Sequence, residues 1–297
     1  MQKRFSKIAV IGAGRVGTAL ALKLKSHGQQ IVTVINRTTS SGKKAADNLG
    51  AVMYSTQLRN IPGDTELIII ATPAQAIPAI VRQLSSLPHL KFRKLFVVHT
   101  SGAHSAKILA PLSRKGSHIA SIHPIQTFPA NQPNNERLKS LKNIYYGIDA
   151  PQKSLREAKS LVKLLGGKHV IIKEEMRPLY HALCVFSSGY IVQLIAAIDE
   201  LSRKLKFPEP WHVITGPLMV TAMQNAIDTT PQDALTGPIL RGDTTTITLH
   251  MKALKKHLPG LILLYTSLGE NTARTAMKNK SIDKKTYAKL ITLLSRS

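Results

Sequence analysis

A glycine-rich turn near the N-terminus constrains the fold of this 297-residue chain more than any other feature. An apolar run, Lys7–Ile11, leads into a G-x-G-x-x-G pattern, and a segment of helical character follows. Glycines at this spacing suit a dinucleotide pyrophosphate, because they permit a tight turn, close approach of the backbone and close packing of helix on strand. The helix also points unpaired N–H groups at the anion. We expect these residues to contact the coenzyme: Gly12, Ala13, Gly14, Arg15, Val16 and Gly17.

The end of the second predicted strand, Gln30–Ile35, indicates which coenzyme the chain prefers. Proteins that bind NAD usually place a carboxylate here to hold the ribose 2′-hydroxyl. This chain has Arg37 and a cluster of hydroxyls instead, and a guanidinium grips a phosphate well. We therefore expect NADP(H) to be preferred over NAD(H). Thr39 or Ser40 can also cap the following helix, Ser41–Leu49. The residues assigned to the coenzyme at this strand end are Asn36, Arg37, Thr38 and Ser40.

Strand-type and helix-type segments alternate through the first part of the chain, which predicts a parallel, doubly wound α/β sheet. Further strands are expected at Ala51–Met53, Glu66–Ala71, Lys94–His99, Ser117–Ile122, Ile144–Asp149 and His169–Ile172. Helices are expected at Gln75–Ser86, Ser105–Lys115 and Ser154–Leu165, and a polar loop at Pro129–Asn135.

From Arg177 onward the strand-type runs disappear and long segments of helical period replace them. The expected helices are Arg177–Lys204, Trp211–Thr229, Asp243–His257, Leu261–Lys278 and Asp283–Arg296. The sequence thus predicts a dinucleotide-binding domain over residues 1–175 and an all-α domain for substrate binding and dimerisation over residues 176–297.

Composition limits the partners and the compartment. The net charge of +25 is spread along the chain without a long basic run, and aromatic residues make up only 5%. We therefore expect no specific nucleic-acid binding, because nucleic-acid-binding proteins concentrate their positive charge on one face and stack bases on aromatic side chains.

The longest apolar stretches are too short for a membrane span. The single cysteine, Cys184, and the lack of a convincing signal peptide fit a cytoplasmic protein. The spacing of histidines and acids predicts no metal site.

Three predicted strands end in residues suited to contact a ligand. Ligands of open α/β sheets lie beyond the carboxyl ends of the strands. We expect the nicotinamide half of the coenzyme to lie near these ends, which contribute Ala71, Thr72, Pro73, Thr100, Ser101 and His123.

Four segments together resemble one family. They are Gly12–Gly17, His99–Ala103, His123–Phe128, and the pair Tyr180–Ser188 with Leu235–Asp243. The chain resembles the two-domain Rossmann-like reductases whose second half is a domain of unknown function. These are similar in build to ketopantoate reductase and pyrroline-5-carboxylate reductase, within the phosphogluconate-dehydrogenase superfamily.

The resemblance covers nearly the whole chain, and it implies an all-helical second domain that often pairs two subunits. It also implies 2-dehydropantoate as the leading substrate. One departure stands out, because Gly189 takes the place of an asparagine that is common in this family. The role of that asparagine would pass to a neighbouring serine, or the substrate differs.

Candidate catalytic residues follow from what ketone reduction needs, namely a proton donor and a group that holds the substrate carboxylate. His181 is the first candidate for the donor, and Ser188 lies seven residues further along the same helix. A packed histidine in a helix interface is the alternative. His123 could donate instead, or could brace its loop. Arg241 is the candidate for the carboxylate, and Asp243 could orient a neighbour or could simply cap a helix.

Three functions remain open from the sequence. The first is an NADPH-dependent reductase of a small 2-oxo acid, most plausibly 2-dehydropantoate to pantoate in pantothenate biosynthesis. The second is an imine reductase of the pyrroline-5-carboxylate type. The third is a non-catalytic sensor that binds a dinucleotide without turnover.

Overall fold

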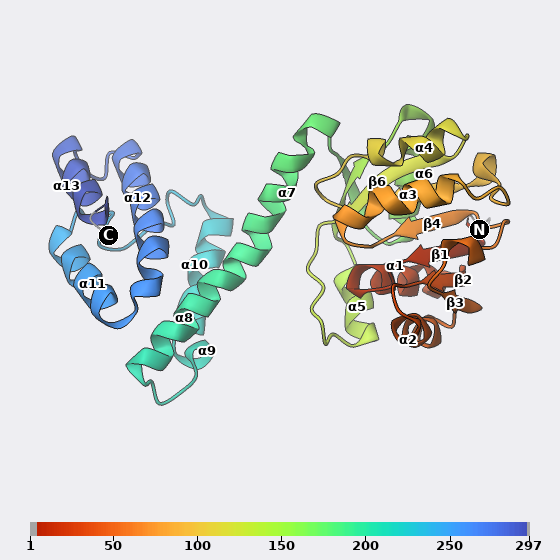
Figure 1. Cartoon of the computed structure of the whole chain (residues 1–297). Helices are drawn as coiled ribbons and strands as arrows, with labels where there is room; N and C mark the ends of the chain where they lie inside the picture. Colours follow the sequence, from red (N-terminus) through yellow and green to blue (C-terminus); the bar gives the residue numbers. More distant parts are fainter. Residues whose placement is uncertain (1–4, 296–297) are drawn as a thin grey trace. The chain divides into compact units, whose positions relative to one another are not determined.

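The computed structural model describes residues 5–295, so that Arg296, the predicted end of the last helix, lies outside the described residues. Its first part contains an eight-stranded sheet in the order β3-β2-β1-β4-β5-β6-β7-β8, with helices on both sides (Figure 1). All eight strands lie at or within two residues of their predicted places. Their bounds are β1 Lys7–Ile11, β2 Gln30–Ile35, β3 Met53–Ser55, β4 Leu67–Ile70, β5 Phe96–His99, β6 His118–Pro124, β7 Tyr145–Asp149 and β8 Lys168–Ile171.

The sheet is mostly parallel, as predicted, with one antiparallel pair. Strand β7 runs antiparallel to β6, with His123 opposite Gly147, and β8 then runs parallel to β7. Parallel neighbours need a crossover over the sheet. The chain between β6 and β7 makes none, because its helix α5 (Asn134–Ser140) packs against α1 instead. The predicted loop Pro129–Asn135 therefore runs into a helix that the sequence did not predict.

The alternation of β1 residues between two cores explains why the strands are continuously apolar. Ile8 and Val10 lie in one core and Ala9 and Ile11 in the other, each almost fully buried. Strands buried on both faces have this pattern. The first core is completed by α1, α2 and α6, and the second by α3 and α4. The bounds are α1 Arg15–Ser26, α2 Thr39–Leu49, α3 Ile77–Ser85, α4 Ala110–Arg114 and α6 Gln152–Leu164.

Two compact units divide the chain, the first ending at Ser188 and the second beginning at Gly189. The predicted division after residue 175 assigned helix α7 (Arg177–Val185) to the helical part. In the structure, α7 belongs to the first unit, where Arg177 and Tyr180 pack against the sheet.

The predicted helix Arg177–Lys204 contains an irregularity. A π-helix, Phe186–Tyr190, separates α7 from α8 (Ile191–Leu205). π-Helical turns widen a helix by one residue and are frequent at functional sites.

The helical segment Glu174–Leu205 is long and apolar enough to cross a membrane by length and composition alone. By contrast, the apolar stretches were predicted from the sequence to be too short for a span.

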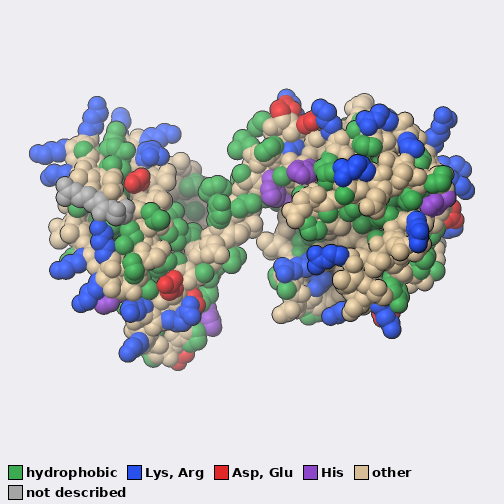
Figure 2. All heavy atoms as spheres, viewed as in Figure 1, with side chains coloured by type: hydrophobic (Ala, Val, Ile, Leu, Met, Phe, Trp, Pro, Cys, Tyr) green, Lys and Arg blue, Asp and Glu red, His purple; other side chains and the backbone are tan. Residues whose placement is uncertain are grey.

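The second unit is helical, as predicted. Ile247, Ala273 and Leu290 lie in a core shared by α11, α12 and α13. Several large apolar side chains stay exposed, including Leu218 at 72% and Leu263 at 74%, and Figure 2 shows hydrophobic side chains on the surface of this unit. The helix bounds are α9 Trp211–Ile214, α10 Gly216–Asp228, α11 Thr244–His257, α12 Ile262–Lys278 and α13 Lys284–Ser295.

Candidate coenzyme and active site

The glycine-rich turn has the tight geometry that its spacing predicts. Gly12 has a φ of +85°, and its N–H donates a 2.8 Å hydrogen bond to the carbonyl of Ile35. A Cβ at Gly12 would lie 2.7 Å from Cγ2 of Thr72 and 2.9 Å from the carbonyl of Ala71. A Cβ at Gly17 would overlap the Gly12 carbonyl oxygen. These two positions therefore require glycine because of close packing within the protein.

Gly14 differs from its two neighbouring glycines. A Cβ at this position would meet no atom of residues 5–295 within 4 Å, and Gly14 is exposed. It precedes the first turn of α1, where Arg15 and Val16 present their N–H groups. We call the turn Gly12–Gly17 the glycine cradle. It fits a dinucleotide pyrophosphate, because the space in front of Gly14 is open and the N-terminus of α1 favours an anion.

The end of β2 is tied to the glycine turn by Asn36. Its Oδ1 accepts a 2.8 Å hydrogen bond from the N–H of Ala13, and its Nδ2 donates to the carbonyl of Ser41. Thr38, and neither Thr39 nor Ser40 as predicted, caps α2, because its hydroxyl accepts from the N–H of Ser41. Arg37 and Ser40 are exposed beside this cap.

The ends of β4 and β5 supply the other residues predicted at the coenzyme. Ala71 and Thr72 pack against Gly12, and the hydroxyl of Thr72 is buried without a partner among the described residues. Pro73 is exposed, and Thr100 is half-buried. The Ser101 N–H donates to Nδ1 of His99, and Ser101 also accepts two hydrogen bonds at its carbonyl, so its loop is held rigidly.

A cluster of aromatic side chains lies where β6 meets α7. Nδ1 of His123 lies 2.7 Å from the Tyr180 hydroxyl, and the ring centroids of His123 and His181 are 5.9 Å apart. A Cβ at Gly102 would overlap His181 and would lie 3.0 Å from Nε2 of His123. The loop after β5 therefore passes directly against both imidazoles.

Beneath this cluster lies Arg177, which is completely buried. Its Nη2 donates a 2.6 Å hydrogen bond to the carbonyl of Ser101 and another to the Ser121 hydroxyl, and its Nη1 lies 3.5 Å from the carbonyl of Gly147. Its guanidinium carbon lies 5.5 Å from the Tyr180 ring centroid. Among residues 5–295 it forms no ion pair with a carboxylate.

Burial and the buried cation keep two histidines uncharged. Burial, with a contribution from Arg177, lowers the pKa of His123 to about 4. Burial likewise lowers the pKa of His99 to about 4, although its hydrogen bond to the Ser105 carbonyl acts in the opposite direction. Burial also raises the pKa of Tyr180. At neutral pH both imidazoles and the phenol are therefore neutral hydrogen-bonding groups.

A cavity of about 340 Å³ opens beside this cluster, entirely within the first unit. Its walls offer imidazole, phenol, thiol and hydroxyl groups along with apolar side chains, which suits a small polar substrate. The lining residues are His123, Ile125, Gln126, Thr127, Tyr180, His181, Leu183, Cys184, Val185, Ser187 and Ser188.

The remaining predicted catalytic residues are distributed between the two units. Ser188 lines the cavity with His181, beyond the start of the π-helix, and its hydroxyl donates a 2.6 Å hydrogen bond to the carbonyl of Cys184. Asp243 and Arg241 lie in the second unit. The Asp243 carboxylate caps α11 and accepts from both the N–H and the hydroxyl of Thr246, which lowers its pKa. Arg241 is exposed.

The sequence did not single out Arg177, Tyr180 or Gly102 as site residues. In the sequence, Arg177 marks only the start of a predicted helix, and Tyr180 is only part of a motif. The one available signal was an arginine at the first position of an apolar helix, directly before Pro178. Its burial depends on contacts with β6 and β7, which local pattern does not reveal.

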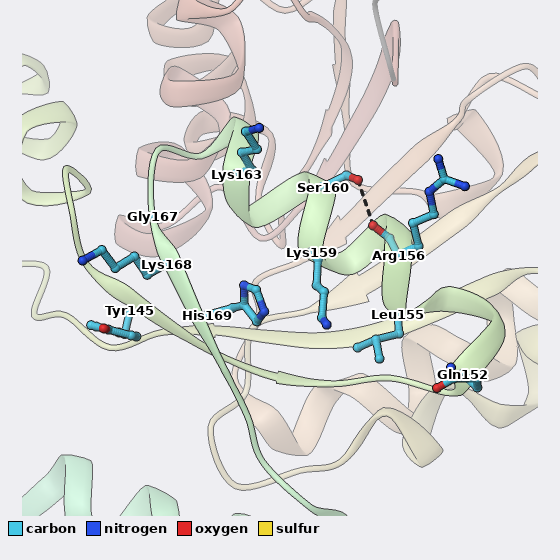
Figure 3. A pocket seen from close by; sticks show the side chains of 10 residues that line it. All are labelled: Tyr145, Gln152, Leu155, Arg156, Lys159, Ser160, Lys163, Gly167, Lys168 and His169. Atoms are coloured by element: carbon cyan, nitrogen blue, oxygen red, sulfur yellow. Dashed lines mark hydrogen bonds between the residues drawn. The ribbon is translucent and has the colours of Figure 1, made fainter.

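A larger cavity, about 810 Å³, lies elsewhere in the first unit, between α6 and the edge strand β8 (Figure 3). Its lysine and arginine side chains come from both α6 and β8. Neither the glycine turn nor the pair His123 and His181 contributes to it. We place the chemistry at the smaller cavity, because His123 there ends β6 at the same sheet edge as the glycine turn and is hydrogen-bonded to Tyr180. The lining residues of the larger cavity are Tyr145, Gln152, Leu155, Arg156, Lys159, Ser160, Lys163, Gly167, Lys168 and His169.

Comparison with known proteins agrees with this architecture. Residues 1–124 match the Rossmann-like domain, and residues 144–272 match the domain of unknown function DUF2520. Glutamyl-tRNA reductases of Sulfurisphaera tokodaii and Caldivirga maquilingensis align over 44 and 71 residues, at 48% and 38% identity. These alignments cover 15% and 23% of this chain, and the chain spans only 11% and 17% of the length of those relatives.

Solved structures share the fold over most of the chain. A Bacteroides fragilis protein provisionally assigned as an NADP oxidoreductase superposes with a TM-score of 0.77 at 24% identity, covering 91% of this chain and 98% of its own. The Myxococcus stipitatus imine reductase in complex with NADP⁺ gives 0.60 at 15% identity, covering 84% and 88%. The Aquifex aeolicus prephenate dehydrogenase with NAD⁺ gives 0.55 at 15% identity, covering 95% and 100%. The predicted fold class is confirmed: a Rossmann-like domain over residues 1–124 is followed by a DUF2520 domain over residues 144–272.

Proposed function

We propose that this protein is an NADP-dependent oxidoreductase that reduces a small 2-oxo acid, with 2-dehydropantoate as the leading substrate. One observation carries the proposal. The glycine cradle follows β1, the histidine cavity lies at the end of β6, and the loops after β4 and β5 lie at the same edge of one sheet. A dinucleotide on the cradle extends along that edge, so its reactive end would reach the cavity.

The preference for NADP(H) rests on Arg37 and its neighbours. Arg37 is exposed at the end of β2, next to the hydroxyls of Thr38 and Ser40, and no carboxylate occurs among residues 36–41. A guanidinium with nearby hydroxyls suits a 2′-phosphate, and a carboxylate there would repel it. The fold alone leaves this choice open, because the structures that share it were solved with NADP⁺ or with NAD⁺.

The bound nicotinamide would supply the hydride, and the protein would supply the proton and the orientation. His123, Tyr180 and His181 are the groups in the cavity able to give a proton to a substrate oxygen. Arg241, an exposed cation, stays our candidate for the substrate carboxylate. Asp243 is occupied by capping α11, which makes it a weaker candidate for orienting a catalytic group.

Imine reduction is the second candidate function. The likeness to the Myxococcus imine reductase favours it, although at 15% identity that likeness concerns the fold. The first unit offers the same cavity to a cyclic imino acid such as 1-pyrroline-5-carboxylate. A sensor without turnover would keep the cradle and would have no need for a proton-transferring cavity.

We also propose that two copies of this chain associate through the helical unit in the cytoplasm. Leu194, Leu264 and Leu268 are each more than a third exposed and line one apolar hollow of this unit, and large exposed apolar patches mark interaction sites. Sedimentation of the full chain tests this, because a concentration-independent monomer would contradict it.

The experiment that tests the function measures NADPH oxidation by the purified chain with 2-dehydropantoate, with 1-pyrroline-5-carboxylate, and without substrate. Coenzyme oxidation with the oxo acid alone is the expected result. Oxidation with the imine alone would select the second candidate. Tight coenzyme binding without turnover of either compound would select the sensor.

A further inference from the structure

The Tyr180 hydroxyl occupies a closely defined position. Tyr180 is 8% exposed, and its hydroxyl lies 2.7 Å from Nδ1 of His123, with the two rings edge to face at 5.6 Å. On its other side the Tyr180 hydroxyl lies so close to Gly147 that a Cβ added to Gly147 would overlap the hydroxyl. Packing therefore holds this phenol in one geometry, with the imidazole as its partner.

The direction of the hydrogen bond follows from the acceptors available. The Cys184 thiol also lies near the hydroxyl, but sulfur is a weak acceptor and an imidazole nitrogen is a strong one. With Tyr180 as the donor to Nδ1, the proton of the neutral His123 ring resides on Nε2. That atom lies on the side of Gly102 and His181.

We propose that His123 and Tyr180 form a two-step proton relay that completes the reduction of a carbonyl substrate, an inference that rests on the reductase function proposed above. As hydride reaches the carbonyl carbon, the Nε2–H bond of His123 breaks and its proton goes to the substrate oxygen. The Tyr180 O–H bond breaks in turn, and that proton goes to Nδ1. His123 stays neutral in this step, but its proton now sits on Nδ1. Water then gives a proton to Nε2 and leaves as hydroxide, while the Nδ1 proton returns to the Tyr180 phenolate, which restores the starting state.

Arg177 is the positioning residue that makes a phenolate tolerable at this place. Its guanidinium is buried, lies 5.5 Å from the Tyr180 ring centroid, and is held by the Ser101 carbonyl and the Ser121 hydroxyl. Among residues 5–295 no carboxylate lies within ion-pair distance of it, and the Asp149 carboxylate acts on it only from further away. A negative charge on Tyr180 would add a nearer counter-charge to this buried cation, which is favourable in a medium of low dielectric constant.

A relay of neutral donors selects the class of substrate. An oxygen that has just received hydride becomes an alkoxide, which is far more basic than a phenolate, so transfer from Tyr180 through His123 is downhill. An iminium ion already carries its proton and gains nothing from such a donor. The relay therefore favours ketone over imine substrates. His181 then serves as a wall of the cavity and a contact for the substrate, with the proton coming from His123.

The relay can be tested without knowledge of the substrate. We would label the full-length protein with ¹⁵N-histidine, saturate it with NADP⁺, and record the imidazole nitrogens from pH 8 to pH 5. The expected result is a neutral His123 with its proton on Nε2 throughout. Tyr180→Phe should shift the Nδ1 resonance, and the exposed control Tyr145→Phe should leave it unchanged. A proton on Nδ1, or a charged His123 at pH 7, would overturn the relay.

Kinetics supply the second readout, with whichever compound the protein reduces. Tyr180→Phe should lower kcat by about 100-fold while the coenzyme Kd stays within about twofold of wild type. His181→Ala should raise KM more than it lowers kcat, and Tyr145→Phe should alter neither. Full kcat in Tyr180→Phe refutes the relay and leaves the reductase proposal intact. Failure to bind any nicotinamide coenzyme refutes the reductase proposal, whereas the tautomer measured by NMR still decides the geometry.

Discussion

Nη2 of Arg177 donates a 2.6 Å hydrogen bond to the carbonyl oxygen of Ser101, so that the first residue of α7 holds the loop after β5. This contact joins two segments that are 76 positions apart in the sequence. It explains why α7 belongs to the sheet unit. The same contact holds the backbone next to Gly102, which lies directly against His123 and His181.

Replacement of Arg177 by methionine should therefore destabilise the first unit. The Ser101 carbonyl and the Ser121 hydroxyl would keep their hydrogen bond to each other but lose their charged donor, and a hydrogen bond to a charged group contributes about 1.5–3 kcal/mol. Equilibrium unfolding in urea measures the change. The exposed Arg203→Met serves as a control, and a loss in Arg177→Met no larger than the control would contradict this role.

A methyl group at Gly102 should disable the cavity without affecting the coenzyme. The Cβ would overlap His181 and would lie 3.0 Å from Nε2 of His123, so both rings must move. Since misplacing a catalytic group by about 1 Å can cost about 100-fold, Gly102→Ala should lower kcat by that order. NADPH affinity, measured by fluorescence titration, should stay at the wild-type value. Unchanged turnover would show that the two imidazoles take no part in the reaction.

The glycine turn allows folding to be separated from binding. A methyl group at Gly14 meets no atom of the described chain, so Gly14→Ala should fold with wild-type stability. The same methyl would occupy the space proposed for the pyrophosphate, and coenzyme affinity should fall at least about tenfold. Gly17→Ala should instead lower both stability and affinity, because its Cβ overlaps the Gly12 carbonyl oxygen. Wild-type affinity in Gly14→Ala would argue against a pyrophosphate at this turn.

Acid should destabilise the first unit through His99. Its pKa is about 4 in the folded protein and about 6.5 when unfolded, so the unfolded state binds more protons between these values. The stability contributed by neutral His99 is complete above pH 6.5 and is lost as the pH falls toward 4. Over that range the loss is on the order of 3 kcal/mol. Thermal unfolding of wild type and His99→Gln at several pH values measures it, and equal pH slopes for the two would contradict it.

Local pattern was enough to predict most of the fold. The strands are apolar runs that end at turn residues, and the glycine spacing identifies the first βα unit, so both are visible over a few residues. The antiparallel β7 was not predictable in the same way. Its direction depends on α5 packing against α1, a contact between elements far apart in the sequence.

The site was only partly predictable for the same reason. His123 and His181 follow from a strand end and a helix motif, and the structure brings them together. The contribution of Arg177 and Tyr180 depends on burial against β6 and β7, and no periodicity encodes that. The π-helix at Phe186–Tyr190 likewise has no simple sequence signature.

A titration of the full-length protein with NADPH and with NADH, followed by nicotinamide fluorescence, tests the central claim most directly. The account predicts saturable binding of both, with NADPH at least about tenfold tighter, because Arg37 holds the 2′-phosphate. Arg37→Glu should remove most of that preference while leaving NADH affinity nearly unchanged. Failure of the purified protein to bind either coenzyme would contradict the account.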